Sequence, residues 1–241
     1  MCKLGINIDH VATLRNARGQ SHPDLLKAAF VLKECKVDSI TMHLREDRRH
    51  IKDEDIFLIR NKVDLPINLE IAPTEEMTKI ALKLNPRSVC FVPEKRMEIT
   101  TEGGLDVKSN MIKIGKLLNL FSNTKIKVAC FIEPSIIQIN CLKSLGIETL
   151  EFHTGSYADA KKKKDIEKKL LLIKESVAYA SDIGFDCHAG HGLNYDNVYE
   201  IAAIKEIKEL NIGHFIIGQA IFSGLKDSIL KMKEIIKEAR K

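Results

Sequence analysis

The chain has 241 residues, of which 44% are hydrophobic and 29% charged, and its formal net charge is +5. This composition excludes a disordered, fibrous or collagen-like chain and is typical of a globular protein. No apolar stretch has the length of a signal peptide or a membrane span, so we expect a cytoplasmic protein with no membrane contact. The modest positive charge alone does not separate a nucleic-acid binder from an enzyme of phosphorylated metabolites.

Short β-branched runs alternate with longer amphipathic stretches along the whole chain. The runs that predict strands are GINID, SITMHL, INLEIA, SVCFVP, KVACFI, TLEFHT, FDCHAG and HFIIG, eight in all. The helical patterns between and after them cover residues 22–35, 54–63, 74–84, 109–121, 135–145, 158–181, 195–207 and 220–239. The lysine run 161–164 falls in one of these patterns and is interpreted as a solvated helix face.

Eight strand-then-helix units without a Pro/Gly/Ser-rich linker predict a parallel sheet, because parallel neighbours need a crossover connection. We therefore expect one domain over residues 1–241, an α/β fold closed into a (β/α)₈ TIM barrel with extra short helices. A doubly wound open sheet is the alternative, but eight units in this length fit the barrel better. The six cysteines form no CxxC pair, so we expect free thiols, no disulfide and no zinc site.

Polar residues stand at or just after the end of most predicted strands, where a buried strand should be apolar. They are Asn7, Asp9, His10, His43, Arg45, Glu70, Glu151, His153, His188, His191, Gly213 and His214. Barrel enzymes build their active sites at this carboxyl end, so the set is expected to converge on one pocket. Any one of them could be a satisfied strand cap, but clustering so many in a dry core without a use is costly.

Two segments after the first strands suit an anionic ligand. The first, from Asn7 to Gly19, is expected to be a polar strand end followed by a basic, glycine-containing loop with Arg18. Arg15 in this loop is expected to pair with a surface carboxylate instead. In the second segment, His43 and Arg45 share a face of the strand by period-two alternation, and one ligand could meet both.

Residues after that second strand are harder to place. His50 lies in a loop whose path does not follow from the sequence, and Arg48 and Arg49 are interpreted as solvated. After the fourth strand, residues 94–107 predict a cover over the site, with Thr100 or Thr101 able to bond a phosphate or hydroxyl and Gly103-Gly104 as a hinge. An ordinary flexible loop is the competing interpretation.

Glycine-containing segments follow the seventh strand (AGHGLN) and surround the eighth (NIGHFIIG). Because barrels often bind phosphate after strands seven and eight, we expect one phosphate there.

The candidate site offers imidazoles and carboxylates, with no nucleophile elbow, Walker loop or opening GxGxxG motif. General acid–base chemistry remains, with burial tuning Glu70 toward neutrality. His188 and His191 with Asp9 and His10 could in principle hold a metal, but His188 is interpreted as a packed residue pointing away from His191, and we expect no metal and no cofactor. The alternatives are another phosphate-binding barrel, such as an aldolase or isomerase, and an RNA-binding protein, which the 5% aromatic content disfavours.

Seven segments of the chain closely resemble the PdxJ family, the pyridoxine 5′-phosphate synthases. They are GINIDHVATLRNARG, TMHLREDRRHI, INLEIAPT, CFVPEKRMEITTEGGLDV, LEFHTGSYA, HAGHGLNYDNV and ELNIGHFIIGQAIF. The resemblance implies condensation of 1-deoxy-D-xylulose 5-phosphate with 3-amino-2-oxopropyl phosphate to pyridoxine 5′-phosphate, phosphate and water. It also implies a homo-octamer, without metal, nucleotide or nucleic acid.

The same resemblance implies a role for each matching position. His43 and Glu70 resemble the family's proton acceptors, His191 its proton donor, and Glu151 the group that stabilises transition-state charge. The residues that resemble contacts of the aminoketone phosphate are Asn7, Arg18, Gly192, Gly213 and His214. Those that resemble contacts of the deoxyxylulose phosphate are Asp9, His10, Arg45, His50 and Thr100.

Overall fold

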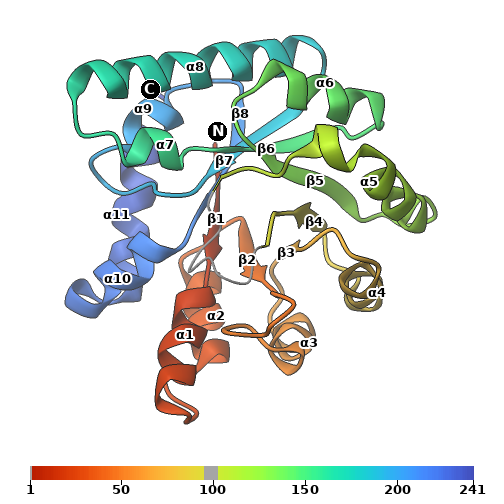
Figure 1. Cartoon of the computed structure of the whole chain (residues 1–241). Coiled ribbons are helices and arrows are strands. Elements are labelled where there is room, and N and C mark those ends of the chain that lie inside the picture. The colour runs from red at the N-terminus through yellow and green to blue at the C-terminus, as the bar shows by residue number, and fades with distance from the viewer. Residues whose placement is uncertain (1, 95–102) are drawn as a thin grey trace.

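A computed structural model of the chain describes residues 2–94 and 103–241. Eight parallel strands pair in sequence order, and the eighth closes on the first, which confirms the predicted barrel. The strands are β1 (Lys3–Asn7), β2 (Ser39–His43), β3 (Ile67–Ile71), β4 (Ser88–Phe91), β5 (Lys127–Ile132), β6 (Thr149–His153), β7 (Asp186–Gly190) and β8 (Ile207–Ile212). Figure 1 shows the helices arranged around these strands.

The helices follow the strands in alternation, with extra ones at several connections. They are α1 (Asp9–Arg18), α2 (Leu25–Glu34), α3 (Asp53–Lys62), α4 (Glu75–Leu84), α5 (Val107–Phe121), α6 (Ile136–Ser144), α7 (Gly155–Ala158), α8 (Lys163–Asp182), α9 (Val198–Ala202), α10 (His214–Ser223) and α11 (Leu225–Glu238). Within the described ranges, no helix combines the length and the apolar character that crossing a membrane requires. The lysine run 161–164 is exposed at the start of α8, as predicted.

The predicted eighth strand was wrong. HFIIG begins helix α10, and the strand is the preceding IKELNI, whose first residue, Ile207, had been assigned to a helix. A short apolar run does not distinguish a strand from a buried helix turn. Glu209 and Asn211 hid the true strand, because they are polar side chains at buried positions. Gly213 and His214 still follow directly after a strand, so their expected place at the barrel mouth is unaffected.

The basic loop predicted after β1 is instead helix α1. Its first turn holds Asp9 and its last turn holds Arg15 and Arg18, charges that favour the two ends of a helix dipole. Gly19 ends the helix with φ 64°, and its N–H bonds the carbonyl of Asn16. The helix buries only three of its ten residues, so its apolar periodicity is too weak to predict it.

A large apolar core lies between the strands and the helices, with Ile6, Ile40 and Leu69 among its fully buried members. Inside the barrel, Cys90 and Ala129 line the same small cavity as Glu151, and buried polar side chains bond one another. Ser39 bonds Glu209 at 2.8 Å, and Thr41 bonds Asn211 at 2.9 Å. Such pairing offsets the cost of burial, so the interior can carry ionisable groups beneath the mouth.

Candidate active site

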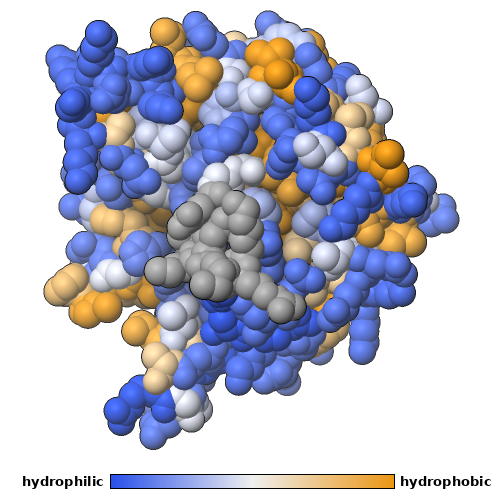
Figure 2. All heavy atoms as spheres, viewed as in Figure 1, coloured by the Kyte–Doolittle hydropathy of each residue, from blue (hydrophilic) through white to orange (hydrophobic). Residues whose placement is uncertain are grey.

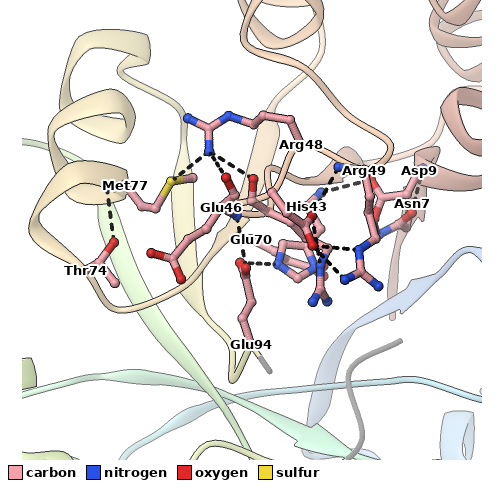
Figure 3. A network of polar contacts seen from close by, with 12 residues as sticks. Asn7, Asp9, His43, Glu46, Arg48, Arg49, Glu70, Thr74, Met77 and Glu94 are labelled. Carbon is pink, nitrogen blue, oxygen red and sulfur yellow. Dashed lines mark hydrogen bonds and ion pairs between the residues drawn. The ribbon is translucent and has the colours of Figure 1, made fainter. Parts of the chain in front are cut away.

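His43 and Glu70 lie side by side at the carboxyl ends of β2 and β3, where the strand register pairs them directly. Nδ1 of His43 is 3.9 Å from Oε2 of Glu70. Asp9, in the first turn of α1, joins them: its Oδ1 accepts the main-chain N–H of His43 at 2.9 Å. Its Oδ2 accepts a hydrogen bond from the Asn7 amide at 2.9 Å (Figure 3). The structure therefore brings four of the predicted residues into one network.

Asp9, His43 and Glu70 place one ligand atom each within 4.8 Å of one another, close enough to hold a cation. The positions of these three side chains are nevertheless explained without a cation. Both oxygens of Asp9 accept protein hydrogen bonds, and burial, followed by the charges of Glu151 and Asp9, raises the pKa of Glu70 well above its usual value. A carboxyl that holds its proton is a poor metal ligand, so we expect acid–base chemistry here.

Glu151 lies below these groups, inside the barrel on β6. Burial raises its pKa to about 7, against the opposing effects of His188 and of a hydrogen bond from Asn211. Asn211 donates that bond from Nδ2 to Oε2 of Glu151 at 2.6 Å. Glu151 can therefore hold or release a proton near neutrality, beside Glu70, whose pKa is also raised.

A second group of imidazoles lies across the mouth, after β6 and β7. The His153 and His191 rings are 4.9 Å apart, and Nδ1 of His153 lies 2.6 Å from Oε1 of Glu133. His191 adopts φ 82°, a strained backbone conformation for any residue with a Cβ atom. Such strained residues are often found at functional sites. Burial, and then the neighbouring His153, lower the pKa of His191 to about 4, so it is neutral at pH 7 without a ligand.

Asn7, His10, Gly213 and His214 gather where β1 and β8 end. The His10 and His214 rings are 4.7 Å apart, and a Cβ on Gly213 would lie 2.7 Å from the Cβ of Asn7. Helix α10 begins at His214, so the free N–H groups of its first turn are at this place. Nδ1 of His10 is buried without a hydrogen-bond partner in the part of the chain that the structure describes. The place is suited to an anion.

The remaining predicted residues are not all in this cluster. The His50 ring is 6.0 Å from that of His43, so His50 lies beside the cluster, and Arg45, two residues past the end of β2, is only 2% exposed. Gly192 directly follows His191 and packs on α7, where its Cβ would lie 2.6 Å from that of Ala158. Arg18 is exposed at the far end of α1. Thr100 lies outside the described residues.

The other cationic side chains near the mouth are paired. Arg15 bonds both oxygens of Asp55 at 2.6 and 2.8 Å, which confirms that it pairs with a carboxylate, although Asp55 is buried and not at the surface as expected. Arg48 bonds Asp53, and Arg49 bonds Asp47. His188 lines a small cavity in the barrel with Glu151 and Asp186, consistent with its interpretation as a packed residue.

The sequence did not single out Glu94, Glu133 and Asn211, each of which bonds a site residue. Asn211 was missed because β8 was misplaced. Glu94 and Glu133 lie just past β4 and β5, and their position after a strand was the available signal.

Comparison with known proteins shows the family to which the chain belongs. The family model of "Pyridoxal phosphate biosynthesis protein PdxJ" matches residues 4–238. Pyridoxine 5′-phosphate synthase from Rhodospirillum rubrum is 50% identical over 96% of this chain and 93% of its own. The enzyme of that name from Sulfurihydrogenibium is 51% identical over 99% of each chain.

Solved structures show the fold alone. A 3-keto-L-gulonate-6-phosphate decarboxylase from Vibrio cholerae superposes with a TM-score of 0.65 at 11% identity, over 100% of this chain and 99% of its own. Thiamine phosphate pyrophosphorylase from Pyrococcus furiosus gives 0.64 at 13% identity, over 99% and 97%. The family match covers nearly the whole chain and the relatives share half of its residues, so the chain belongs to the PdxJ family of pyridoxal phosphate biosynthesis proteins.

Proposed function

We propose that the chain is a pyridoxine 5′-phosphate synthase, which condenses 1-deoxy-D-xylulose 5-phosphate with 3-amino-2-oxopropyl phosphate. The product is pyridoxine 5′-phosphate, with release of phosphate and water. The supporting observation is that His43, Glu70 and Asp9 form one contact network at the mouth of a barrel whose relatives carry this name. Each step of such a condensation moves a proton, and imidazole and carboxyl groups are the usual carriers of protons in enzymes.

His43 and Glu70 act as proton acceptors in this proposal. Without a ligand, Glu70 holds its own proton because its pKa is raised, so it must first release it. The Nδ1 atom of His43, 3.9 Å away, is placed to receive that proton after a small movement. A cationic iminium formed by the two substrates would also lower the pKa of Glu70 and favour its carboxylate.

His191 acts as the proton donor and Glu151 stabilises positive charge that develops in the transition state. His191 is neutral in the ligand-free site because its pKa is lowered to about 4, and a bound phosphate would restore its proton affinity by adding negative charge. Glu151, with a pKa of about 7, can become anionic as positive charge develops above it. His191 therefore gains its charge only with the substrates bound, whereas Glu151 is balanced between its two forms near pH 7.

Two phosphate groups need two anion sites. We assign the aminoketone phosphate to Asn7, Gly213 and His214, where helix α10 begins, together with Gly192, which follows His191, and Arg18. The deoxyxylulose phosphate is assigned to Asp9, His10, Arg45, His50 and Thr100. Nδ1 of His10 and Nδ1 of His50 are buried without a partner among the described residues, which leaves both available to a ligand.

The aldolase alternative would use a lysine at a strand end as the Schiff-base nucleophile. The strands contain only Lys3, Lys127 and Lys208, and each is the first or second residue of its strand, at the end away from the mouth. The strands thus offer no such nucleophile.

The test is formation of pyridoxine 5′-phosphate by purified protein from the two substrates, with a chelator present. The proposal expects product at the same rate with and without the chelator. Lack of product from substrates of verified purity would overturn the proposed function. Activity that is lost when the chelator is added would overturn only the metal-free mechanism.

We also propose a homo-octamer that works in the cytoplasm as a single catalytic domain. Phe222 and Ile221, at the end of α10, are 85% and 68% exposed, which is unusual for large apolar side chains outside an interface. Figure 2 shows hydrophobic surface over this end of α10. All six cysteines are free thiols, as a reducing compartment favours. Light scattering should give eight times the 27.2 kDa chain mass, and Phe222→Lys should lower it.

A further inference from the structure

We propose that Glu94 is a positioning residue for His43, which fixes the tautomer and the orientation of the imidazole in the reaction. The inference rests on the proposed function only for the role of His43. Its structural content, a defined tautomer held by a buried carboxylate, stands independently and is tested separately below.

Glu94 lies three residues past the end of β4 and turns its side chain back toward β2 (Figure 3). Oε1 is 2.9 Å from Nε2 of His43, and Oε2 accepts the main-chain N–H of Glu46 at 3.0 Å. Its side chain is only 6% exposed. Because both oxygens are engaged and water is largely excluded, the carboxylate is held in one position.

This contact determines which nitrogen of His43 carries the proton. An ionised carboxylate can only accept hydrogen bonds, so Nε2 must be protonated and Nδ1 keeps the lone pair. Nδ1 is the nitrogen that faces Glu70, 3.9 Å away. The main-chain N–H of His43 is held by Asp9, so the residue is fixed at its backbone and at the far side of its ring. The arrangement presents a basic nitrogen to the site.

Several titratable or charged groups surround the His43 ring besides Glu94. Glu70 and Asp9 face it from β3 and α1, and Arg45 and His50 follow it in the chain. Burial opposes ionisation of Glu94, but the hydrogen bond and charge of His43, the main-chain N–H of Glu46 and the charge of Arg45 together outweigh it and lower the pKa of Glu94 below its usual value. Of the two glutamates beside the ring, Glu94 thus carries the charge and Glu70 the proton.

The first test compares Glu94→Gln with wild type in the two-substrate assay. The glutamine is of similar size but can donate to Nε2, which favours the wrong tautomer. We expect kcat to fall on the order of 100-fold or more, as loss of an orienting carboxylate does elsewhere, with KM changed less than about threefold because Glu94 is directed at His43. The acidic limb of the kcat–pH profile should move to lower pH, because the imidazolium form loses a neighbouring negative charge.

Glu46→Gln is the matched control. It removes an exposed carboxylate next to the same contact without touching the His43 ring, so kcat and the pH profile should stay as in wild type. Equal effects of the two substitutions would show a general charge effect and overturn the positioning role. Thermal unfolding of each variant checks that the fold is retained.

The second test measures the tautomer in wild type, so it depends neither on activity nor on the folding of Glu94→Gln. Nitrogen-15 spectra of wild type, with the His43 signals identified by their loss in His43→Gln, should show a protonated Nε2 and an unprotonated Nδ1 at pH 8. A protonated Nδ1 in wild type would overturn the inference even if Glu94→Gln does not fold. If wild type makes no pyridoxine 5′-phosphate but shows the expected tautomer, the proposed function fails and the positioning by Glu94 stands.

Discussion

Asn211 donates its amide N–H to Glu151 across 2.6 Å, and Thr41 bonds the other end of the same amide at 2.9 Å. These two hydrogen bonds lie inside the barrel and pack against Gly5 and Gly190. A Cβ on Gly5 would lie 2.2 Å from Oδ1 of Asn211, and one on Gly190 would lie 2.5 Å from Oε1 of Glu151. Glu151 is thus held by a hydrogen-bond network that fits only because Gly5 and Gly190 have no side chains.

Replacing Asn211 should disturb both of its neighbours. Asn211→Leu removes the donor to Glu151 and the acceptor for Thr41, and each buried group left without a partner costs about 1–3 kcal/mol. We expect the free energy of unfolding at pH 7 to fall by roughly 2–5 kcal/mol, as measured in urea. Thr41→Val removes only one bond and should cost less than half as much. If both variants lost the same free energy of unfolding, the proposed hydrogen-bond network would be contradicted.

The raised pKa of Glu151 makes stability depend on pH. Below its ordinary value of 4.5 the acid is protonated in both states, whereas between 4.5 and about 7 the unfolded chain releases the proton that the folded protein keeps. Burial of Glu151 therefore costs stability progressively as pH rises through that window. Glu151→Gln should raise the free energy of unfolding by on the order of 1–3 kcal/mol at pH 8 and far less at pH 4. A gain that is the same at both pH values would contradict the assignment.

The positive φ of His191 predicts a difference between two substitutions that both remove the imidazole. Glycine adopts φ 82° without strain and alanine does not. His191→Gly should be more stable than His191→Ala by about 1 kcal/mol, measured by thermal unfolding at pH 7. Both should lose most of the product formation, because the proton donor is gone. A fully active variant of either kind would remove His191 from the mechanism.

Two glycines five residues apart test the anion site. A Cβ on Gly213 meets Asn7 at 2.7 Å, whereas one on Gly218, inside α10, meets nothing within 4 Å. Gly213→Ala should displace Asn7 and raise the KM for the aminoketone phosphate at least tenfold. Gly218→Ala should leave KM unchanged and stabilise the helix by up to about 1 kcal/mol. An unchanged KM in both variants would place the phosphate elsewhere.

The sequence predicted the barrel because its units alternate regularly, and it predicted the mouth because polar residues interrupt apolar strands. It misplaced β8, since Glu209 and Asn211 break the apolar pattern and HFIIG imitates a strand. It missed α1, whose ends are marked by charge and by Gly19 rather than by an apolar stripe. Glu94 and Glu133 stand just past a strand, which was the one signal available for them, but the bonds that give them a role join segments distant in the sequence.

The central claim is that His43, Glu70 and His191 act together on two phosphorylated substrates at one barrel mouth. The most direct measurement is the rate of pyridoxine 5′-phosphate formation by His43→Ala, Glu70→Gln and His191→Gln, each first shown to unfold at a temperature close to that of wild type. We expect every variant to be folded and to lose product formation by at least about 100-fold, the scale of an acid–base contribution. Wild-type turnover in any of the three would contradict the account.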